Sequence, residues 1–369
     1  MPITPRHVVI APDAFKGGPS APEVAEAIAA GWRAVHPDDR LTLSPMADGG
    51  EGTVMAVHTA YPHSTLVTVE GVTGPDGRKT SALYCRLDDG TAVLELASSS
   101  GLPKMRVLNP GLATTRGLGE VMAHALQHGA TRLMIGLGGS ASTDAGMGAL
   151  YALGLKALDE NGAQVPDGGD ALALIDTLDA THVLSPPAGG ITLLTDVAAP
   201  FTGVTGAAHV FGPQKGADAQ TIARLDAALA HVARIAGGAP DAAGAGAAGG
   251  TGYGLATFMQ ATLIPGGPAL ADLVGVTDAL HTADLVITAE GALDASTFTG
   301  KVVHTLYEKA RERDIHMIAI AGKVAADVVA SKPGLSAMST SEVAGSVAAS
   351  FKNPLDAIRQ AAEVAAKDG

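Results

Sequence analysis

The segment HVVIAPDAFKGGPSAPEVAEAIAAGW, residues 7–32, contains an apolar run, a glycine-containing loop and an amphipathic stretch in that order. Residues 7–11 form a short, mainly apolar run, which is typical of a strand buried in a parallel sheet. Ser20 and Glu23 have the spacing of a capping box, with Pro22 in the first turn, and they predict the start of a helix. The apolar positions of that helix are Val24, Ile28, Gly31, Trp32 and Val35. A strand, a loop and a helix in succession are the building block of α/β folds.

The same order recurs along the chain. Apolar runs typical of buried strands occupy residues 41–46, 131–137, 191–196, 284–288 and 316–322. Helices are predicted near residues 53–60, 146–158 and 301–313, and a periodic apolar pattern predicts another over residues 222–235. Residues 67–96 differ, because short strands there are joined by the turns TGPDG and LDDG, which indicates antiparallel pairing in a second domain. The sequence therefore predicts a mainly parallel α/β architecture.

Length and composition narrow the class of protein. The chain has 369 residues, enough for about two domains. Apolar residues make up 47% and charged residues 17%, a composition typical of folded chains. The mean hydropathy of +0.25 comes mainly from Gly and Ala, and no run approaches the roughly 18 apolar residues of a membrane-spanning helix. We therefore expect no membrane association.

Charge and cysteine content indicate the expected partners and compartment. The net charge is -13, and no basic run could bind a nucleic-acid backbone, so nucleic acid is not an expected partner. Cys85 is the single cysteine, which excludes an internal disulfide framework. Residues 1–6 are followed by a strand-like run rather than by the apolar core of a signal peptide. A cytoplasmic protein is expected.

Two loops that follow predicted strands near the N-terminus carry charged side chains. In open parallel sheets, ligands bind beyond the carboxyl ends of the strands. The loop APDAFKGG places Asp13 and Lys16 there, where a lysine can neutralise a phosphate or carboxylate. The loop ADGGEGT places Asp48 and Glu51 around two glycines, and these carboxylates suit Mg²⁺ or substrate hydroxyls. Alternatively, the first loop is merely solvated and the second pair only caps a helix.

The third loop, IGLGGSASTDAGMG at residues 135–148, is the richest in glycine. Gly136, Gly138 and Ala141 satisfy the dinucleotide-binding fingerprint, with Asp159 at a suitable distance for a ribose contact. GLGGSAS also resembles the phosphate loop of the galactokinase-like small-molecule kinases. Both interpretations predict an oxyanion cradle, whereas a tight turn that lets a helix pack closely on a strand is the structural alternative.

Two further loops complete the set. Residues 195–217 place Asp196 at a strand end and Lys215 in a turn rich in glycine and proline. Residues 288–301 place Glu290 and Asp294 between a strand and a helix. Acidic residues at strand ends, together with a lysine, suit Mg²⁺ and phosphoryl transfer. The five loops together indicate a phosphotransferase.

Taken together, APDAFKG, ADGGEGT, GLGGSASTDAGMG, FGPQKGA, GAGAAGGTGYG and AEGALDASTFTGK resemble the type 1 glycerate kinase family. Thr114 to Glu120 and the stretch LASSSGL, residues 96–102, match further family motifs. The resemblance runs from Ile10 to beyond Gly322, in the order and spacing of the family.

The resemblance implies phosphorylation of D-glycerate by ATP with Mg²⁺, most often to give 2-phosphoglycerate and ADP. It also implies two α/β domains: a discontinuous, flavodoxin-like domain with a mainly parallel sheet, and a second domain inserted into it. We place the first at residues 1–65 and 280–369 and the inserted domain at 66–279. Residues 241–254, DAAGAGAAGGTGYG, have the composition of a flexible linker, but the resemblance implies an ordered functional loop.

The chain departs from the family pattern at several positions. Ala14 replaces a common serine, residues 142–144 read STD rather than TND, and residues 199–201 read APF rather than NPL. Ala292 stands where members commonly carry arginine. If that arginine holds a phosphate or the glycerate carboxylate, this chain needs compensation by Lys16 or Arg116, binds more weakly, or uses another substrate.

Roles follow for the candidate residues as hypotheses. Asp196 is the predicted base, although the other acidic residues could exchange roles with it. The catalytic candidates are Asp196, Lys16, Asp13, Asp48 and Glu51; the substrate contacts are Arg116, Ser98, Ser99 and Lys215; the nucleotide contacts are Gly138, Gly139, Ser140 and Asp144; and the metal ligands are Glu290 and Asp294.

Competing functions remain open at this stage. A dinucleotide-dependent oxidoreductase would use residues 136–141, but it would leave the acidic loops without a role. A catalytically silent binding protein would explain the departures at Ala199 and Ala292. A kinase for another small hydroxy acid and assembly into a homo-oligomer are also compatible with the sequence.

Overall fold

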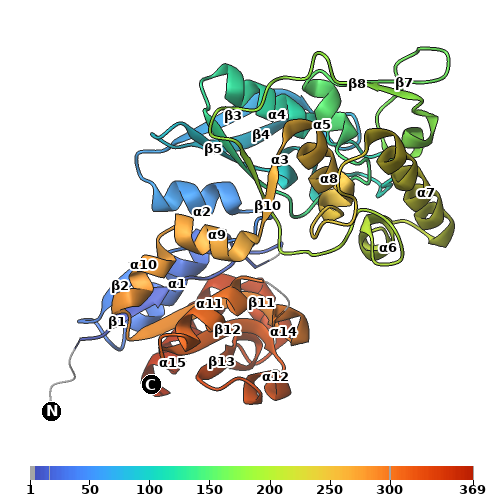
Figure 1. Ribbon diagram of the computed structural model, residues 1–369. Helices are drawn as coiled ribbons and strands as arrows, with labels where there is room; N and C mark the ends of the chain where they lie inside the picture. Colours follow the sequence, from blue (N-terminus) through green and yellow to red (C-terminus); the bar gives the residue numbers. More distant parts are fainter. Residues whose placement is uncertain (1–4, 16, 299–300, 369) are drawn as a thin grey trace. The chain divides into compact units, whose positions relative to one another are not determined.

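The computed structural model describes residues 5–15, 17–298 and 301–368. The chain forms two compact units, and each is built from separate stretches of sequence (Figure 1). Unit 1 comprises Met1–Asp48, Met55–Pro62 and Gly267–Gly369, and unit 2 comprises Gly49–Val54 and His63–Gly266. The chain therefore passes between the units after residues 48, 54, 62 and 266.

Unit 1 contains a parallel five-stranded sheet in the order β13-β12-β11-β1-β2. The strands are β1 (His7–Ile10), β2 (Arg40–Leu43), β11 (Leu285–Leu293), β12 (His316–Val324) and β13 (Leu335–Ser339). Numbered along unit 1 alone, this order is 2-1-3-4-5, which is the flavodoxin-like order. The predicted flavodoxin-like fold is confirmed, and its two halves come from opposite ends of the sequence.

The long helices of unit 1 pack on this sheet through small and branched side chains. One face of the sheet buries Val8, Ile10 and Ile287 against Ile28 of α1 and Ile358 of α15. The backbone N–H of Ser20 donates to Glu23 at 2.8 Å, which confirms the predicted capping box at the start of α1. The helices that lie wholly in unit 1 are α1 (Ala21–Arg33), α10 (Val276–Ala279), α11 (Val302–Arg311), α12 (Ala326–Ala330), α13 (Thr340–Val343), α14 (Val347–Lys352) and α15 (Pro354–Asp368). Two more helices, α2 (Thr53–Ala60) and α9 (Gly266–Leu273), begin in unit 2 and continue into unit 1.

Unit 2 contains a mixed six-stranded sheet in the order β10-β9-β6-β5-β4-β3. The pairs β10–β9, β9–β6 and β6–β5 are parallel, whereas β5–β4 and β4–β3 are antiparallel. This confirms the antiparallel character predicted for residues 67–96. The strands are β3 (Thr65–Thr73), β4 (Lys79–Arg86), β5 (Thr91–Glu95), β6 (Arg132–Gly136), β9 (Ile191–Leu194) and β10 (Thr262–Ile264), and β7 (Lys156–Leu158) and β8 (Thr177–Asp179) form a separate hairpin.

The helices of unit 2 differ from the prediction in one place. The predicted helix over residues 222–235 lies within the 18-residue α7 and buries Leu225, Leu229 and Val232. The helix predicted near residues 146–158 is wrong in extent, because α5 has only six residues and a strand follows it. The helices are α3 (Leu96–Ser100), α4 (Arg116–Gln127), α5 (Met147–Ala152), α6 (Ala207–Phe211), α7 (Ala219–Ala236) and α8 (Ala247–Met259).

Residues 241–254 are not a flexible linker. They lead into α8, and Ala248, Gly249 and Gly250 adopt left-handed backbone conformations at its start. A Cβ on Gly249 would lie 2.1 Å from the carbonyl oxygen of Ser142, so only glycine fits against that backbone. The glycine-rich composition therefore reflects close packing rather than disorder.

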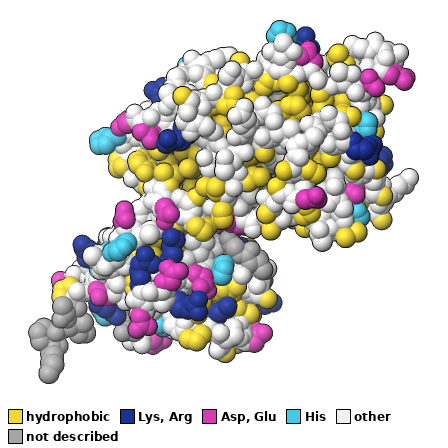
Figure 2. Space-filling model, in the orientation of Figure 1, with side chains coloured by type: hydrophobic (Ala, Val, Ile, Leu, Met, Phe, Trp, Pro, Cys, Tyr) yellow, Lys and Arg dark blue, Asp and Glu magenta, His cyan; other side chains and the backbone are white. Residues whose placement is uncertain are grey.

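Two surface properties bear on the predicted partners. No helix within the described ranges is long and apolar enough to span a membrane. On the visible face of unit 1, basic and acidic side chains are interspersed (Figure 2), so that face presents no uniformly basic surface.

A single glycine sets the distance between the two longest helices of unit 1. A Cβ on Gly31 would lie 2.1 Å from the carbonyl oxygen of Arg359 and 2.9 Å from Cβ of Ala362. We expect Gly31→Ala to lower the free energy of unfolding by about 1–3 kcal/mol, because the helices must separate. Urea denaturation measures this, with Ala30→Ser on the exposed face of α1 as the control. Unchanged stability of Gly31→Ala would contradict the close packing of α1 on α15.

Candidate active site

In unit 1, the carboxyl ends of β1 and β11 place three predicted acidic residues at one edge of the sheet. The backbone N–H of Asp13 donates to Ala289 at 3.0 Å, which joins the loop after β1 to β11. The Asp13 carboxylate accepts a hydrogen bond from the N–H of Ala14 at 2.7 Å. Lys16, the predicted cation of this loop, lies outside the described residues.

Glu290 and Asp294 lie close together but in different surroundings. Glu290 is buried, accepts a hydrogen bond from Thr297 Oγ1 at 2.6 Å and lies 3.7 Å from the Lys301 ammonium. Burial raises the pKa of Glu290, and the charge of Asp294 adds to that rise. Hydrogen bonds from Ser296 lower the pKa of Asp294. The pair thus combines one buried and one exposed carboxylate.

The predicted loop with Asp48 and Glu51 contains a boundary between the units. Asp48 is the last residue of the first stretch of unit 1, whereas Glu51 belongs to the short stretch Gly49–Val54 of unit 2. Gly49 and Gly50 lie very close to β6 and the loop after it. A Cβ on Gly136 would lie 2.3 Å from the carbonyl oxygen of Gly49, and a Cβ on Gly138 would lie 2.5 Å from Cα of Gly50. Glycine is therefore required on the β6 side of this contact.

Glu95, at the end of β5, is a residue that the sequence analysis missed. Its carboxylate accepts a hydrogen bond from the N–H of Val54 at 3.1 Å and also bonds the N–H groups of Gly52 and Thr53. Burial raises the pKa of Glu95 to about 7, and the nearby charge of Glu51 adds to that rise. Its position as the last residue of a strand, directly before LASSSGL, is the signal that could have found it.

The glycine loop after β6 lies against the segment that follows β5. The N–H of Ala141 donates to Ser100 at 3.0 Å, and the N–H of Leu102 donates to Gly139 at 2.9 Å. Gly139 is exposed and has a φ of +75°. The backbone N–H groups of Gly139 and Ser140 donate no hydrogen bond to any other residue that the structure describes.

Lys215 lies directly behind this loop. It is 2% exposed, and its Nζ donates to Ser140 Oγ at 2.8 Å and to the carbonyl oxygen of Ser142 at 2.5 Å. Burial lowers the pKa of Lys215 to about 7, against an opposing effect of the Asp144 charge. The structure thus brings Lys215, predicted as a substrate contact, together with the predicted nucleotide loop.

Asp144 is fully buried and joins two helices. Its carboxylate accepts hydrogen bonds from the N–H and the hydroxyl of Thr115, both at 2.8 Å, and from the N–H groups of Gly146 and Gly148 at 3.2 Å. Burial raises the pKa of Asp144 in spite of these donors. Because the four donors engage both oxygens, the geometry favours positioning of α4 and α5 over direct contact with a sugar or metal.

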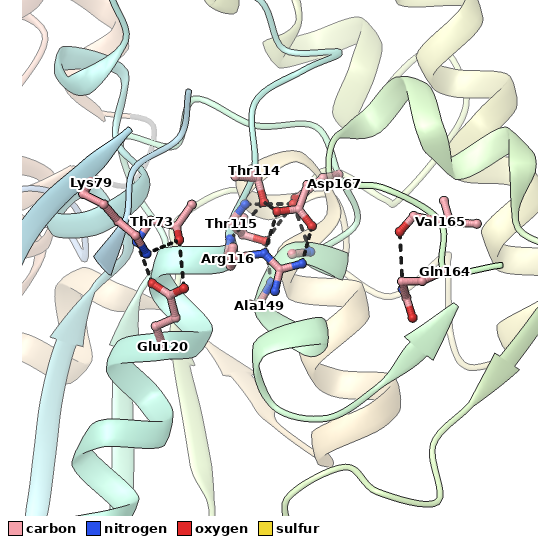
Figure 3. A network of polar contacts seen from close by, with 12 residues as sticks. Thr73, Lys79, Thr114, Thr115, Arg116, Glu120, Ala149, Gln164, Val165 and Asp167 are labelled. Carbon is pink, nitrogen blue, oxygen red and sulfur yellow. Dashed lines mark hydrogen bonds and ion pairs between the residues drawn. The ribbon is translucent and has the colours of Figure 1, made fainter. Parts of the chain in front are cut away.

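Three predicted substrate contacts have partners within unit 2. Arg116 forms a bidentate pair with Asp167 at 2.6 and 2.7 Å, and Figure 3 shows its guanidinium directed at that carboxylate. The hydroxyl of Ser98 accepts the N–H of Leu83 at 2.8 Å, and Ser99 is 1% exposed. Their roles as glycerate contacts stay predictions.

Asp196 follows β9, on the same carboxyl edge as the glycine loop. Its carboxylate accepts a hydrogen bond from the N–H of Gly266 at 2.8 Å, and the side chain is partly exposed. The carboxyl ends of β5, β6 and β9 thus carry Glu95, the glycine loop and Asp196 on three neighbouring strands. The structure brings a carboxylate and the glycine loop to one edge of the sheet, where ligands of open parallel sheets bind.

The dinucleotide interpretation of residues 136–141 is wrong. That fingerprint needs a helix immediately after the glycines, but α5 begins only at Met147. Asp159, the candidate ribose contact, instead accepts the N–H groups of Asn161 and Ala163 within a turn.

Comparisons with known proteins show which family this chain is similar to. The model of the Glycerate kinase family matches residues 8–368. The chain is 41% identical over 329 residues to a glycerate kinase of Bacillus subtilis and 39% identical over 331 residues to a glycerate 2-kinase of Escherichia coli, with 87% of this chain and 86% of each relative covered. A crystal structure from Salmonella typhimurium LT2 assigned to glycerate kinase 2 has a TM-score of 0.81 and 36% identity, covering 99% of this chain and 98% of that one.

The fold, the acidic strand ends and the glycine loop with its buried lysine define a two-unit α/β kinase. The chain belongs to the glycerate kinase family. The family resemblance predicted from the motifs is therefore confirmed.

The raised pKa of Glu95 predicts a dependence of stability on pH. Between the ordinary value of 4.5 and about 7, folded Glu95 holds a proton that the unfolded chain has lost. The free energy of unfolding should therefore fall as pH rises through this range, by at most about 1.4 kcal/mol per pH unit from this group. Urea denaturation from pH 5 to 8 should show a smaller fall in Glu95→Gln, which keeps an acceptor for Val54 but does not titrate. Equal pH dependence in both proteins would refute the assignment.

Proposed function

We propose that this protein transfers the γ-phosphoryl group of ATP to D-glycerate, with Mg²⁺, to give 2-phosphoglycerate and ADP. The observation that carries the proposal is the glycine loop at the carboxyl edge of unit 2. The N–H groups of Gly139 and Ser140 in this loop donate to no other described residue, and Lys215 lies behind it. Family membership supports glycerate as the substrate. The name of the Escherichia coli relative, a glycerate 2-kinase, supports the position of transfer.

The glycine loop fits a phosphate group. Unengaged backbone N–H groups at an exposed glycine form the kind of concavity that binds anions. No carboxylate within the described ranges forms an ion pair with Lys215, so the loop has no acid in direct contact with its lysine. Gly139 and Ser140 would donate to the phosphate oxygens, and Gly138 permits the close approach of Gly50 that fixes the loop.

The acidic residues fit Mg²⁺, which prefers oxygen ligands and commonly takes only one or two carboxylates besides water and phosphate. No group of three or more His, Cys, Asp or Glu side chains close enough to hold a metal occurs among the residues that the structure describes. Glu290 and Asp294 would supply the two carboxylates in unit 1. Bound Mg²⁺ supplies positive charge that offsets the charge of the transferred phosphate.

Asp196 would act as the general base. It lies beyond the carboxyl end of β9, beside the strand that carries the glycine loop, and it is exposed enough to meet a hydroxyl group. The proton that leaves the glycerate hydroxyl would go to its carboxylate. Glu95 would position the segment that contains Glu51 through its hydrogen bonds to Gly52, Thr53 and Val54.

The glycerate carboxylate requires a cation in the site. Arg116 is already paired with Asp167, so Lys16 is the better candidate of the two predicted cations. Lys323 on β12 is in register with Ala292 on β11, which puts an exposed cation beside the position where the arginine is absent. That same absence favours, as a second candidate, a kinase for another small hydroxy acid.

An ADP-release assay with Mg-ATP and D-glycerate tests the function directly. We expect turnover with D-glycerate and little with L-glycerate or without substrate, and phosphorus NMR should identify 2-phosphoglycerate as the product. Turnover only with other hydroxy acids would support the second candidate. ATP binding without turnover on any of them would refute the proposal and indicate a silent scaffold.

Loss of the base should act on catalysis more than on binding. We expect Asp196→Asn to reduce kcat by about 100-fold or more, because proton transfer to a positioned base contributes about 10²–10⁴-fold. Nucleotide affinity should change little. Asp176→Asn, an exposed acid of unit 2, is the matched control. Near-normal turnover of Asp196→Asn would exclude Asp196 as the base.

A further inference from the structure

Lys215 is the last residue of a short 3-10 helix, Pro213–Lys215, which is followed by Gly216 with a φ of +90°. Gly216 packs against Leu108, where a Cβ would lie 2.9 Å from the Leu108 side chain. The side chain of Lys215 is almost completely removed from solvent, and its amine ends between Ser140 and Ser142 of the glycine loop. The lysine is therefore held in place from both ends.

The hydrogen bonds of this amine match its uncharged form. A neutral amine has two N–H groups, whereas an ammonium has three. Nζ has two acceptors, Ser140 Oγ and the carbonyl oxygen of Ser142, and the structure gives it no third acceptor among the residues described. A buried ammonium with an unsatisfied N–H and no counterion is unfavourable.

No described carboxylate forms an ion pair with the Lys215 amine. The charge of Asp144 raises the pKa of Lys215, but the described part of the chain contains no carboxylate within 4.0 Å of Nζ. The Asp144 oxygens are engaged by Thr115, Gly146 and Gly148. Burial consequently outweighs the Asp144 charge and lowers the pKa of Lys215 to about 7.

The adjacent part of the loop carries further polar groups without partners. Ser142 Oγ and Thr143 Oγ1 are completely buried and make no hydrogen bond within the described residues. Buried hydroxyl groups usually have a partner in the functional state of a protein. Together with the unengaged N–H groups of Gly139 and Ser140, they make this loop a polar site that is short of acceptors.

We propose that Lys215 is an uncharged amine in the ligand-free protein and takes up a proton when a nucleotide phosphate binds at Gly139 and Ser140. This inference rests on the proposed function, because it assigns the loop to ATP. The proton comes from solvent and goes to Nζ, and no other bond changes. A phosphate at Ser140 supplies both the negative charge and the acceptors that favour the ammonium. Lys215 then stabilises the bound phosphate without holding an uncompensated charge in the empty protein.

Isothermal titration calorimetry of MgADP binding in buffers with different ionisation enthalpies measures the proton directly. Nucleotide phosphates are already ionised at pH 8, so they contribute little. With a pKa of about 7 in the free protein, we expect about 0.9 proton taken up at pH 8 and about 0.1 at pH 6. Lys215→Met should bind MgADP more weakly, with no dependence on the buffer. Lys156→Met, which removes an exposed lysine of unit 2, should behave like the wild type.

The outcomes separate this inference from the proposed function. MgADP binding with the same enthalpy in every buffer at pH 8, or equal proton uptake in Lys215→Met, would overturn the inference and leave the function intact. Absence of any MgADP and MgATP binding would refute the proposed function and the inference together. If Lys215→Met does not fold, the proton uptake of the wild type at pH 6 and at pH 8 still decides. Equal proton uptake at the two pH values would refute a neutral Lys215.

Discussion

Backbone-to-backbone contact between glycine-rich segments is the constraint on which the candidate site depends. The segment around Gly49 and Gly50 lies against Gly136 and Gly138, and Gly249 lies against Ser142, at distances that exclude any side chain. These contacts bring the short stretch Gly49–Val54 to the carboxyl ends of β5 and β6. The strands and helices around them supply a rigid frame, but the glycines determine that loops from distant parts of the sequence can meet there.

Buried charge is handled in two different ways within this frame. Asp144 keeps four donors around its carboxylate and so joins the starts of α4 and α5. Among the described residues, Lys215 has two neutral acceptors and no ion-pair partner, so desolvation rather than pairing determines its protonation. The carboxylate of Asp144 is fully hydrogen-bonded within the protein, whereas the amine of Lys215 has acceptors for two N–H groups among the described residues, which suit its neutral form. The same short loop, residues 138–144, contacts or contains both groups.

Unit 1 does not depend on such close glycine contacts to assemble its acidic residues, because the topology of its parallel sheet places the loop residues at one edge. The order 2-1-3-4-5 brings the loops after β1 and β11 next to each other although about 275 residues separate them in the chain. Asp13, Glu290 and Asp294 are neighbours for this reason. The separate environments of Glu290, which is buried, and Asp294, which is exposed, then follow from the local turns around Thr297 and Ser296.

The sequence by itself determined the α/β class, the flavodoxin-like unit, the capping box at Ser20, the antiparallel strands over 67–96 and the family. The α/β class, the capping box and the antiparallel strands depend on local periodicity and turn chemistry. The family was found from motifs whose residues are contiguous, and the flavodoxin-like unit follows from the resemblance to that family. It could not reveal Glu95, the pairing of Arg116 with Asp167, the short α5, or the burial of Asp144 and Lys215. Those features depend on which segments pack together, since the sequence is the same whether a charged side chain is exposed to solvent or buried in a core. Only the tertiary structure decided them, because burial and partners set the charge and role of each group.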